Sequence, residues 1–410
     1  MTITKHFDVF IIGGGPAGAI AGAKLVQAGL KVKLVEKMIF PRFVIGESLL
    51  PRCNQLLEQA NMLECIKKSN FQLKPGVAFQ TEKSLEVVHF EQNLGEAFNS
   101  SFQVKREVFD HELLLNAEKK GVEVEFESEV IAFDAVACLV TVKTKLGRLV
   151  KYQVKKVIDA SGYGRVLPKL LALDKPSDQC IRKAILCRMT GDIRPEPNGK
   201  DGYIFVDIHD NNQAWIWNIP FNDGVTSTGI VCDEAYFNKF NLSEEAFFDM
   251  IIEANPTASK RYKNATKIND VGFINGYSAS VTKLFDDNFV LVGNASEFLD
   301  PVFSSGVTLA LESGFKSAEL IINEFNGDQV DWQKEYADYM MVGINVFREY
   351  VNAWYDGRLQ TILFSEDKAE NVTRSIVSVL SGYVWNEENV FVSNPKKMVD
   401  TVYQLTKIDD

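Results

Sequence analysis

The chain has 410 residues, of which 46% are hydrophobic and 24% charged, so it can bury a large core and is longer than one ordinary domain. Its 44 basic and 55 acidic residues give a net charge of −11, which repels polyphosphates and argues against nucleic acid as a partner. The six cysteines form no CxxC pair and only four histidines occur, so we expect no metal site and no disulfide framework. The cysteines are interpreted as buried cytosolic thiols.

We do not expect the apolar start of the sequence to be a signal peptide. Residues 7–12 are apolar, but three glycines follow at once and no cleavage-like site appears. Since no run of about twenty uncharged apolar residues occurs, we expect no membrane span. A cytoplasmic protein is therefore expected.

The first half of the chain predicts alternating strands and helices. An apolar strand at 7–12, a helix at 17–28 and a strand at 31–36 make a βαβ unit. Further along, the pattern predicts strands between 70 and 105, a helix at 106–120, strands over 122–142 and a buried strand at 155–160.

Strands dominate again over residues 183–231. Stretches 203–209 and 214–219 flank Asp210-Asn211-Asn212, which is typical of a hairpin. After these come a helix at 244–255, a strand at 289–292, a long helix at 307–325 and a helical remainder from 330.

This order predicts an α/β fold with a Rossmann-like dinucleotide-binding domain, an interleaved β-rich domain and a helical C-terminal region. The dinucleotide-binding domain is discontinuous and takes residues 1–70, 103–180 and 280–330. The β-rich substrate domain takes 71–102 and 181–279, and the helical C-terminal region takes 331–410.

A glycine motif between the first strand and helix indicates a pyrophosphate site, made of Gly13, Gly15, Pro16, Ala17 and Gly18 within GGGPAG. Glycines let the backbone approach a pyrophosphate at the helix N-terminus, and Glu36 at the end of the next strand can bind ribose hydroxyls. A merely tight turn is the alternative, which the complete βαβ order disfavours. Glutamate at position 36 also disfavours the 2′-phosphate of NADP.

Two later runs select FAD over NAD by resemblance. Residues 158–162 (IDASG) and 291–295 (LVGNA) each follow an apolar strand and resemble flavin-contacting motifs of the FAD-dependent monooxygenase superfamily that includes para-hydroxybenzoate hydroxylase. The resemblance implies a Rossmann-like FAD-binding domain whose further cofactor contacts are Arg42, Ser48, Arg106, Val130, Asp159, Gly293, Asn294, Pro301 and Gly306. For Arg106, a surface charge on a helix is the alternative interpretation.

Four narrower segments resemble the flavin-dependent halogenases, especially the branch acting on phenols and pyrroles. They are GESLLP at 46–51, FQLK at 71–74, WIWNIP at 215–220, which fits the WxWxIP signature, and FLDPVFSSG at 298–306, which fits FxxPxxSxG. The resemblance implies an FAD-dependent monooxygenase-type oxidoreductase that is a two-component halogenase. Reduced FAD, dioxygen and halide then give hypohalous acid, which travels past Trp215 and Trp217 to Lys74.

The partners implied are a halide ion, an electron-rich aromatic substrate, free or bound to a carrier protein, and a separate flavin reductase. A reductase is expected because no second GxGxxG unit for a nicotinamide cofactor is present. The family usually has aspartate where this chain has Asn294. Members acting on free tryptophan carry a glutamate where this chain has Phe303, which argues against that substrate.

The halogenase segments also have physical interpretations of their own. Trp215 and Trp217 share one face of a strand that Pro220 ends, and they line either a channel or an ordinary core. Small residues before a helix, Ser304, Ser305 and Gly306, suit an anion such as halide, or the serines cap the helix.

Lys74 lies in an apolar, phenylalanine-flanked stretch. As an ordinary lysine it would be a solvated turn charge. In a dry tunnel its pKa would fall toward that of a usable amine.

Two other functions remain open on this scaffold. One is an aromatic hydroxylase or a double-bond reductase that does not use halide. The other is a non-catalytic FAD-binding protein. Halide-dependent turnover distinguishes the halogenase from both.

Overall fold

The computed structural model describes residues 4–176, 181–196, 201–276, 280–297 and 299–408. Its centre is a six-stranded sheet in the order β21-β22-β12-β2-β3-β8. All neighbouring strands are parallel except the edge pair β21 and β22. The strands are β2 (Val9–Ile12), β3 (Val32–Val35), β8 (Glu123–Glu125), β12 (Lys156–Asp159), β21 (Phe285–Asp286) and β22 (Phe289–Leu291).

Both faces of this sheet are covered, which explains its continuous apolar strands. Val9 and Ile11 of β2 belong to the core shared with the helices, whereas Phe10 and Ile12 belong to the core under a second sheet. The helices are α1 (Pro16–Gln27), α4 (Arg106–Lys119) and α9 (Ser305–Asn326), with α1 in contact with both others. The second sheet has the order β1-β11-β10-β9, with β1 (Thr4–His6), β9 (Glu129–Asp134), β10 (Leu139–Lys143) and β11 (Leu149–Gln153).

The largest sheet combines strands from two separate parts of the chain, in the order β18-β14-β17-β16-β15-β5-β6, with β19 also paired to β14. Its strands are β5 (Gly76–Gln80), β6 (Leu85–His89), β14 (Arg182–Thr190), β15 (Ile204–His209), β16 (Ala214–Pro220), β17 (Val225–Asp233), β18 (Thr266–Lys267) and β19 (Gly272–Asn275). One face packs on α6 (Glu234–Asn238), α7 (Glu244–Ala254) and α8 (Pro256–Arg261). The other face, with Trp215 and Trp217, joins the central core.

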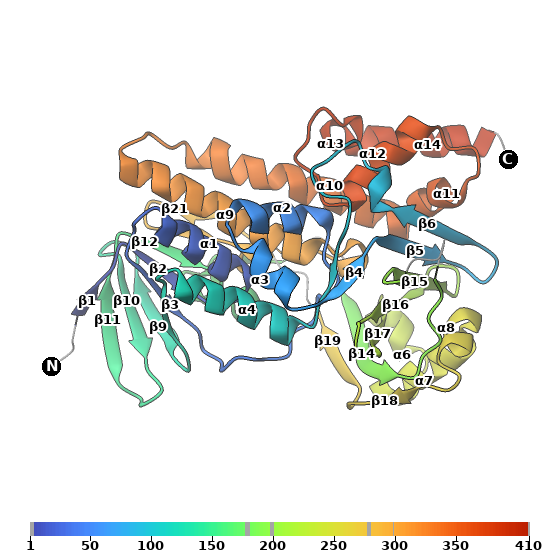
Figure 1. The fold of residues 1–410 in the computed structure, drawn as a ribbon, viewed down its shortest axis with the longest axis horizontal. Helices are drawn as coiled ribbons and strands as arrows, with labels where there is room; N and C mark the ends of the chain where they lie inside the picture. The colour runs from blue at the N-terminus through green and yellow to red at the C-terminus, as the bar shows by residue number, and fades with distance from the viewer. Residues whose placement is uncertain (1–3, 177–180, 197–200, 277–279, 298, 409–410) are drawn as a thin grey trace.

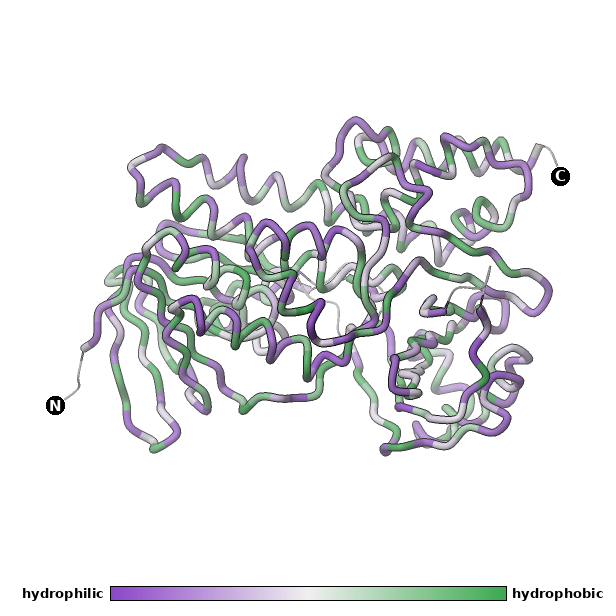
Figure 2. The backbone as a smooth tube through the Cα atoms, viewed as in Figure 1, coloured by the Kyte–Doolittle hydropathy of each residue, from purple (hydrophilic) through white to green (hydrophobic). Residues whose placement is uncertain are grey.

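Helices form the C-terminal part of the molecule and lie above the large sheet in Figure 1. A π-helical stretch (Gln333–Asp338) leads into α10 (Tyr339–Tyr355), followed by α11 (Arg358–Phe364), α12 (Glu370–Leu380), α13 (Val390–Ser393) and α14 (Pro395–Ile408). Among the described residues, no helix is long and apolar enough to cross a membrane. Figure 2 shows the reason, because hydrophilic and hydrophobic positions alternate along the long helices.

The remaining elements are short connections. They are α2 (Pro51–Gln59), α3 (Leu63–Lys68), α5 (Val166–Leu170), the strand pair β4 (Gln72–Lys74) and β7 (Ser101–Gln103), the pair β13 (Asp174–Lys175) and β20 (Ser280–Val281), and 3₁₀ turns at Phe90–Gln92, Gly162–Gly164, Gly293–Ala295 and Pro301–Phe303.

The predicted α/β fold is confirmed, including the βαβ unit and the hairpin, whose strands β15 and β16 are antiparallel. The domain boundaries stay a prediction, although the large sheet does unite strands from 76–89 and 182–275. One detail was wrong: Cys65 is only partly buried, because it lies on α3 at the edge of the core. Cys180 and Phe298 lie outside the described residues.

Candidate active site

A cavity of about 630 Å³ runs between the carboxyl ends of the central strands and the large sheet. Ligands of open α/β sheets bind at this position. Most of the expected cofactor residues line the cavity, namely Gly13, Gly15, Pro16, Ala17, Glu36, Arg42, Ser48, Arg106, Val130, Gly293, Asn294, Pro301 and Gly306. Gly18 and Asp159 do not line it.

The glycine turn is shaped by three different requirements. A Cβ on Gly13 would lie 2.5 Å from the carbonyl oxygen of Ala160, and φ of Gly13 is +99°, so only glycine suits this position. Gly18 packs α1 onto the turn, because a Cβ there would lie 2.1 Å from the Gly13 oxygen. Gly15 instead faces the cavity, and its nearest neighbour would be Arg42 Nη2 at 3.6 Å. The space next to Gly15 is therefore available to a ligand.

Glu36 is fixed by the backbone beside this turn. Its carboxylate accepts hydrogen bonds from the Gly14 and Met38 amides, both at 2.8 Å. The side chain is buried yet lines the cavity. It is thus held at the end of β3, where a ribose hydroxyl would be recognised.

Two arginines bring positive charge to the same cavity. Arg106 donates to both oxygens of Asp110 at 2.7 and 3.0 Å, and also to the carbonyls of Ile45 and Gly46. The adjacent carboxylate raises the pKa of Arg106 although burial opposes the shift. Arg42 also binds Asp110, at 3.3 Å. Arg106 is therefore a buried charge at the cavity wall, and the alternative of a surface charge was wrong.

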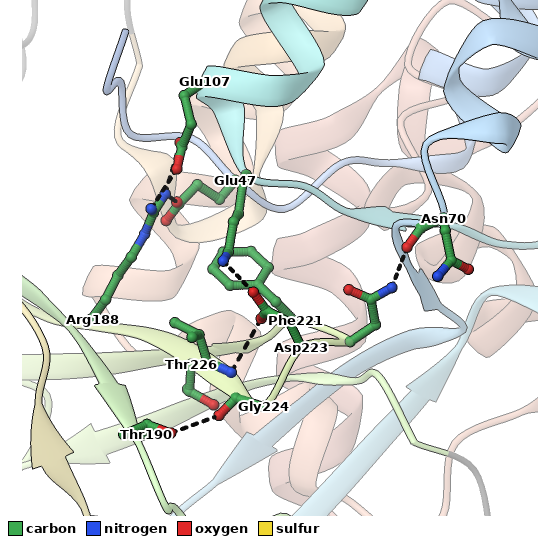
Figure 3. Close-up of polar contacts among 12 residues, drawn as sticks. Glu47, Asn70, Glu107, Arg188, Thr190, Phe221, Asp223, Gly224 and Thr226 are labelled. Carbon is green, nitrogen blue, oxygen red and sulfur yellow. Dashed lines mark hydrogen bonds and ion pairs between the residues drawn. The ribbon is translucent and has the colours of Figure 1, made fainter. Parts of the chain in front are cut away.

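The loop that carries Gly46 and Ser48 is tied to the large sheet through Glu47. Arg188 of β14 donates to Glu47 at 2.6 Å and to Glu107 of α4 at 2.8 Å, an arrangement seen in Figure 3. Burial raises the pKa of Glu47, whereas Arg188 opposes that shift. Glu47 lines the cavity and is joined through Arg188 to β14 and α4, but no charge pattern in the sequence singles it out as a site residue.

A buried polar atom in this cavity lacks a partner. The hydroxyl of Ser48 is buried, lines the cavity and has no hydrogen-bond partner among the residues that the structure describes. Unsatisfied buried groups are costly, so a ligand atom is expected there. A ligand in the cavity can therefore approach both Gly15 and the Ser48 hydroxyl, as a dinucleotide would.

Asp159 supports the second loop from behind. Its carboxylate accepts from the amides of Ser161 and Leu167 at 2.9 and 2.6 Å, and it is completely buried. Burial raises the pKa of Asp159, against these hydrogen bonds. In the third loop, Gly293 has φ of +56°, and Asn294 next to it lines the cavity. Asp159 thus shapes the site, whereas Asn294 can reach a ligand.

The paired tryptophans lie on the cavity side of β16. Trp215 and Trp217 have ring centroids 6.1 Å apart at 54°, so the rings are neighbours but are not stacked in parallel. Trp217 lies over Gly229 of β17, where a Cβ would come within 2.3 Å of the indole. Pro220 is the last residue of β16 and does not line the cavity. The tryptophans are thus both core and cavity wall.

The turn at 300–306 adjoins the cavity through Pro301, Val302, Ser304 and Gly306. Ser304 has φ of +56° and makes no side-chain capping bond, although it stands at the N-terminus of α9. Asp300 caps the preceding turn instead, by accepting from the Val302 amide. Ser305 is buried at the start of α9. The first turn of α9, whose amides have no carbonyl partner within the helix, therefore adjoins the cavity at Ser304 and Gly306.

Lys74 lies in a second, very small cavity of about 10 Å³. Its side chain is 1% exposed, its amine donates to the Leu49 carbonyl at 2.9 Å, and it lies 5.2 Å from the Phe90 ring centre. Burial lowers the pKa of Lys74 to about 7. The solvated-turn alternative was therefore wrong.

The two cavities share wall residues, namely Ile204, Val302 and Ser304. Phe303 lines only the Lys74 cavity, with Leu50, Val77, Phe79, Phe90 and Leu380. The turn at 300–306 thus separates Lys74 from the large cavity by the thickness of a few side chains.

Some cavity residues had no signal in the sequence. Tyr163 and Ala184 line the large cavity, and Phe79 and Phe90 enclose Lys74, but each looks like any other core residue in its segment. Gly229 could have been suspected, because a glycine inside a strand often marks a close approach by a neighbour.

A Rossmann-like sheet with a glycine turn, an acidic ribose position and a cavity of dinucleotide size defines an FAD-dependent oxidoreductase. The tryptophan halogenase family model matches residues 8–89 and 80–401, and the chain belongs to this family. A flavin-dependent halogenase of Armillaria mellea is 27% identical over 96% of this chain and 84% of its own.

Three other similar proteins illustrate the relationship. A 1H-pyrrole-2-carbonyl (peptidyl-carrier protein) chlorinase of Pseudomonas fluorescens is 29% identical over 94% of this chain and 91% of its own. A corresponding brominase of Pseudoalteromonas luteoviolacea is 29% identical over 83% and 82%. The crystal structure of a flavoprotein/dehydrogenase from Cytophaga hutchinsonii is 38% identical, covers 99% of this chain and 100% of its own, and has a TM-score of 0.94.

Proposed function

We propose that this protein is a two-component flavin-dependent halogenase that acts on an electron-rich aromatic ring, a pyrrole or a phenol. The observation that carries the proposal is the buried amine of Lys74, enclosed by apolar side chains and separated from the FAD cavity by three shared wall residues. An ordinary core does not bury a lysine without a carboxylate partner, because desolvation of the charge is costly.

The residues of the large cavity would hold FAD. Gly13 would shape the turn and Gly15 would leave room for the pyrophosphate at the N-terminus of α1, with Arg42 as a nearby positive charge. Glu36 would accept hydrogen bonds from ribose hydroxyls, and Ser48, Arg106, Val130, Asn294 and Pro301 would contact the rest of the cofactor. When bound in reduced form, FAD supplies with dioxygen the oxidising equivalent that converts halide to hypohalous acid.

The turn before α9 would hold the halide. Backbone amides at Ser305 and Gly306 begin a helix of 22 residues, and such amides have no partners within the helix. The αL conformation of Ser304 lets the chain reverse into the helix at this point. An anion there would lie at the wall between the two cavities.

Lys74 would receive hypohalous acid on the other side of this wall. With a pKa of about 7, roughly half of the amines are neutral at neutral pH. A neutral amine can hydrogen-bond hypohalous acid, or it can take the halogen to form an N–halogen bond with release of water. Either route places the electrophile beside Phe303 and away from the flavin cavity.

The surroundings of Lys74 favour an uncharged acceptor ring. Apart from Lys74 and Ser304 the described lining is apolar, so it offers no carboxylate to pair with the ammonium of a free amino acid. Both pyrrole halogenases that resemble this chain are named for a pyrrole carried on a peptidyl-carrier protein. A carrier-bound pyrrole is therefore our first candidate. Since a volume of about 10 Å³ admits little more than a water molecule, its ring must displace lining side chains.

A dehydrogenase or double-bond reductase without halide chemistry is the second candidate. It is favoured by the 38% identity to a protein named flavoprotein/dehydrogenase, and by Asn294 where halogenases usually have aspartate. Such an enzyme would turn over equally well without halide.

The deciding experiment incubates the protein with reduced FAD, dioxygen and bromide or chloride over a panel of free phenols, free pyrroles and carrier-bound pyrrole. Mass spectrometry should detect a halogenated product only when halide is present. Oxidised or reduced product that is independent of halide would select the second candidate, and flavin reoxidation with every acceptor unchanged would indicate a non-catalytic FAD-binding protein.

The proposal also requires a separate flavin reductase. NADH or NADPH alone should reduce the bound flavin slowly or not at all, because the chain has one dinucleotide motif. Stopped-flow absorbance measures this reduction directly, and adding a flavin reductase should restore turnover. Rapid bleaching of the flavin by NADPH alone would show a single-component enzyme instead.

A further inference from the structure

We propose that Tyr355 is a positioning residue that fixes the halide-binding turn to the cavity wall by joining Trp215 to Asp300. This inference rests on the proposed function, because it assigns a role toward halide. It depends on a chain of three side chains from three elements that meet behind the cavity.

The first link joins the cavity wall to the C-terminal helices. The indole nitrogen of Trp215 on β16 donates to the Tyr355 hydroxyl at 2.8 Å. Tyr355 ends α10, and the hairpin turn holds that end, since the Asn212 amide donates to the Trp354 and Tyr355 carbonyls at 2.9 and 3.2 Å. The position of the hydroxyl is therefore set by the same hairpin that carries Trp215.

The second link has a fixed direction. An indole N–H can only donate, so the Tyr355 oxygen accepts from Trp215 and its own proton is free to go elsewhere. It goes to Asp300 Oδ2, 3.0 Å away. Asp300 is 1% exposed and Trp215 is 2% exposed, so water does not easily replace either bond.

The third link reaches the turn itself. The other oxygen of Asp300 accepts from the Val302 amide at 3.1 Å and so holds the turn that leads to Ser304. Arg182 lies 3.4 Å over the Tyr355 ring and 3.8 Å from Asp300 Oδ2, and its contact with the ring helps to keep the ring in place. The Tyr355 hydroxyl thus connects the wall residue and the capped turn.

The variant Tyr355→Phe removes this connection while keeping the ring and its contact with Arg182. Trp215 and Asp300 then each lose a partner in a buried setting, and the turn can shift to find another. We expect the holoprotein to keep FAD but to bind halide more weakly. The measurement is a titration of the oxidised FAD-loaded protein with sodium bromide at constant ionic strength, followed by flavin absorbance.

Tyr152→Phe is the matched control. Its hydroxyl donates to Glu125 at 3.0 Å, and the residue is buried in the core under the second sheet, away from the hairpin and from the turn at 300–306. Both variants lose one tyrosine–carboxylate bond and should lower the melting temperature. Only Tyr355→Phe should raise the bromide Kd, roughly tenfold, a loss expected for one buried hydrogen bond.

A double variant tests whether Tyr355 acts through Trp215. Trp215→Phe should itself weaken bromide binding, and adding Tyr355→Phe should then weaken it no further. A bromide Kd for Tyr355→Phe within about twofold of wild type, or independent effects in the double variant, would overturn the inference.

The wild-type protein separates this inference from the proposed function. If it binds bromide but brominates no acceptor, the halogenase proposal fails and the Kd comparison still decides the role of Tyr355. If it binds no bromide, the turn is not a halide site and the inference about Tyr355 is overturned too.

Discussion

The large cavity and the Lys74 cavity are built by different means. The large cavity combines backbone turns such as that at Gly13 and Gly15, charged groups and apolar side chains, drawn from segments between Ile12 and Ala310. The small cavity is lined almost wholly by apolar side chains from distant segments, from Leu50 to Leu380. The first must recognise a charged dinucleotide, whereas the second must exclude water and lower the pKa of an amine.

Because the two cavities are built differently, they should respond to different substitutions. Cofactor binding depends on backbone shape and charge, so substitutions at the glycine turn or Arg106 should affect FAD binding. The chemistry at Lys74 depends on desolvation, so a substitution there should leave FAD binding unchanged. The following variants test that division.

Gly15→Leu should abolish FAD uptake, because its side chain would extend into the space that the pyrophosphate needs. Flavin absorbance of the purified, FAD-incubated protein measures this directly. Gly272→Leu is the control, since it adds the same side chain on β19 where nothing lies within 4 Å of the new Cβ. Undiminished FAD affinity of Gly15→Leu would contradict the assignment of the cavity.

Arg106→Lys should weaken FAD binding about tenfold and lower the melting temperature, since an ammonium cannot make the paired bonds to Asp110 and also reach Ile45 and Gly46. Arg358→Lys is the control. Arg358 begins α11, away from the cavity, and its guanidinium also pairs with several carboxylates that a lysine could not all reach. This variant should lower stability but leave the FAD Kd unchanged. Equal FAD affinities in the two variants would show that Arg106 is only structural.

Lys74→Met should change how stability depends on pH. The folded pKa of Lys74, about 7, lies below its unfolded value of 10.5, so the unfolded chain binds the extra proton between these values. The buried Lys74 therefore lowers the free energy of unfolding of the wild type most at and below pH 7, and this penalty shrinks as the pH rises toward 10.5. The stability advantage of Lys74→Met should therefore fall by up to about 1.4 kcal/mol per pH unit above pH 7. Urea unfolding at pH 7, 8 and 9 measures it, and a constant difference would contradict the low pKa.

The sequence predicted most of the fold because the relevant signals are local. The glycine turn, Glu36 and the hairpin around Asn211 follow from short sequence patterns that require known backbone conformations. The structure places these features where they were predicted. It also places α7 at Glu244–Ala254, close to the predicted helix at 244–255.

The candidate site was only partly predictable, because burial is a property of the whole fold. Lys74 and its sequence neighbours fit a turn equally well, and Lys74 is enclosed by side chains from elsewhere in the chain, among them Phe90, Phe303 and Leu380. The resemblance predicted Asp159 as a cofactor contact, but its two carboxylate oxygens accept hydrogen bonds from the Ser161 and Leu167 amides. Tyr355 gave no sign of its link to Asp300, which depends on where α10 ends against the hairpin.

The division between the two cavities is tested most directly by a single turnover of Lys74→Met beside wild type, both loaded with reduced FAD, bromide and an accepted substrate. Flavin reoxidation by dioxygen, followed by absorbance, should be the same in both proteins. Brominated product should fall by a factor on the order of 10² or more in the variant, as expected for loss of a positioned catalytic group. Product within a few-fold of wild type would show that the buried amine of Lys74 has no part in the reaction.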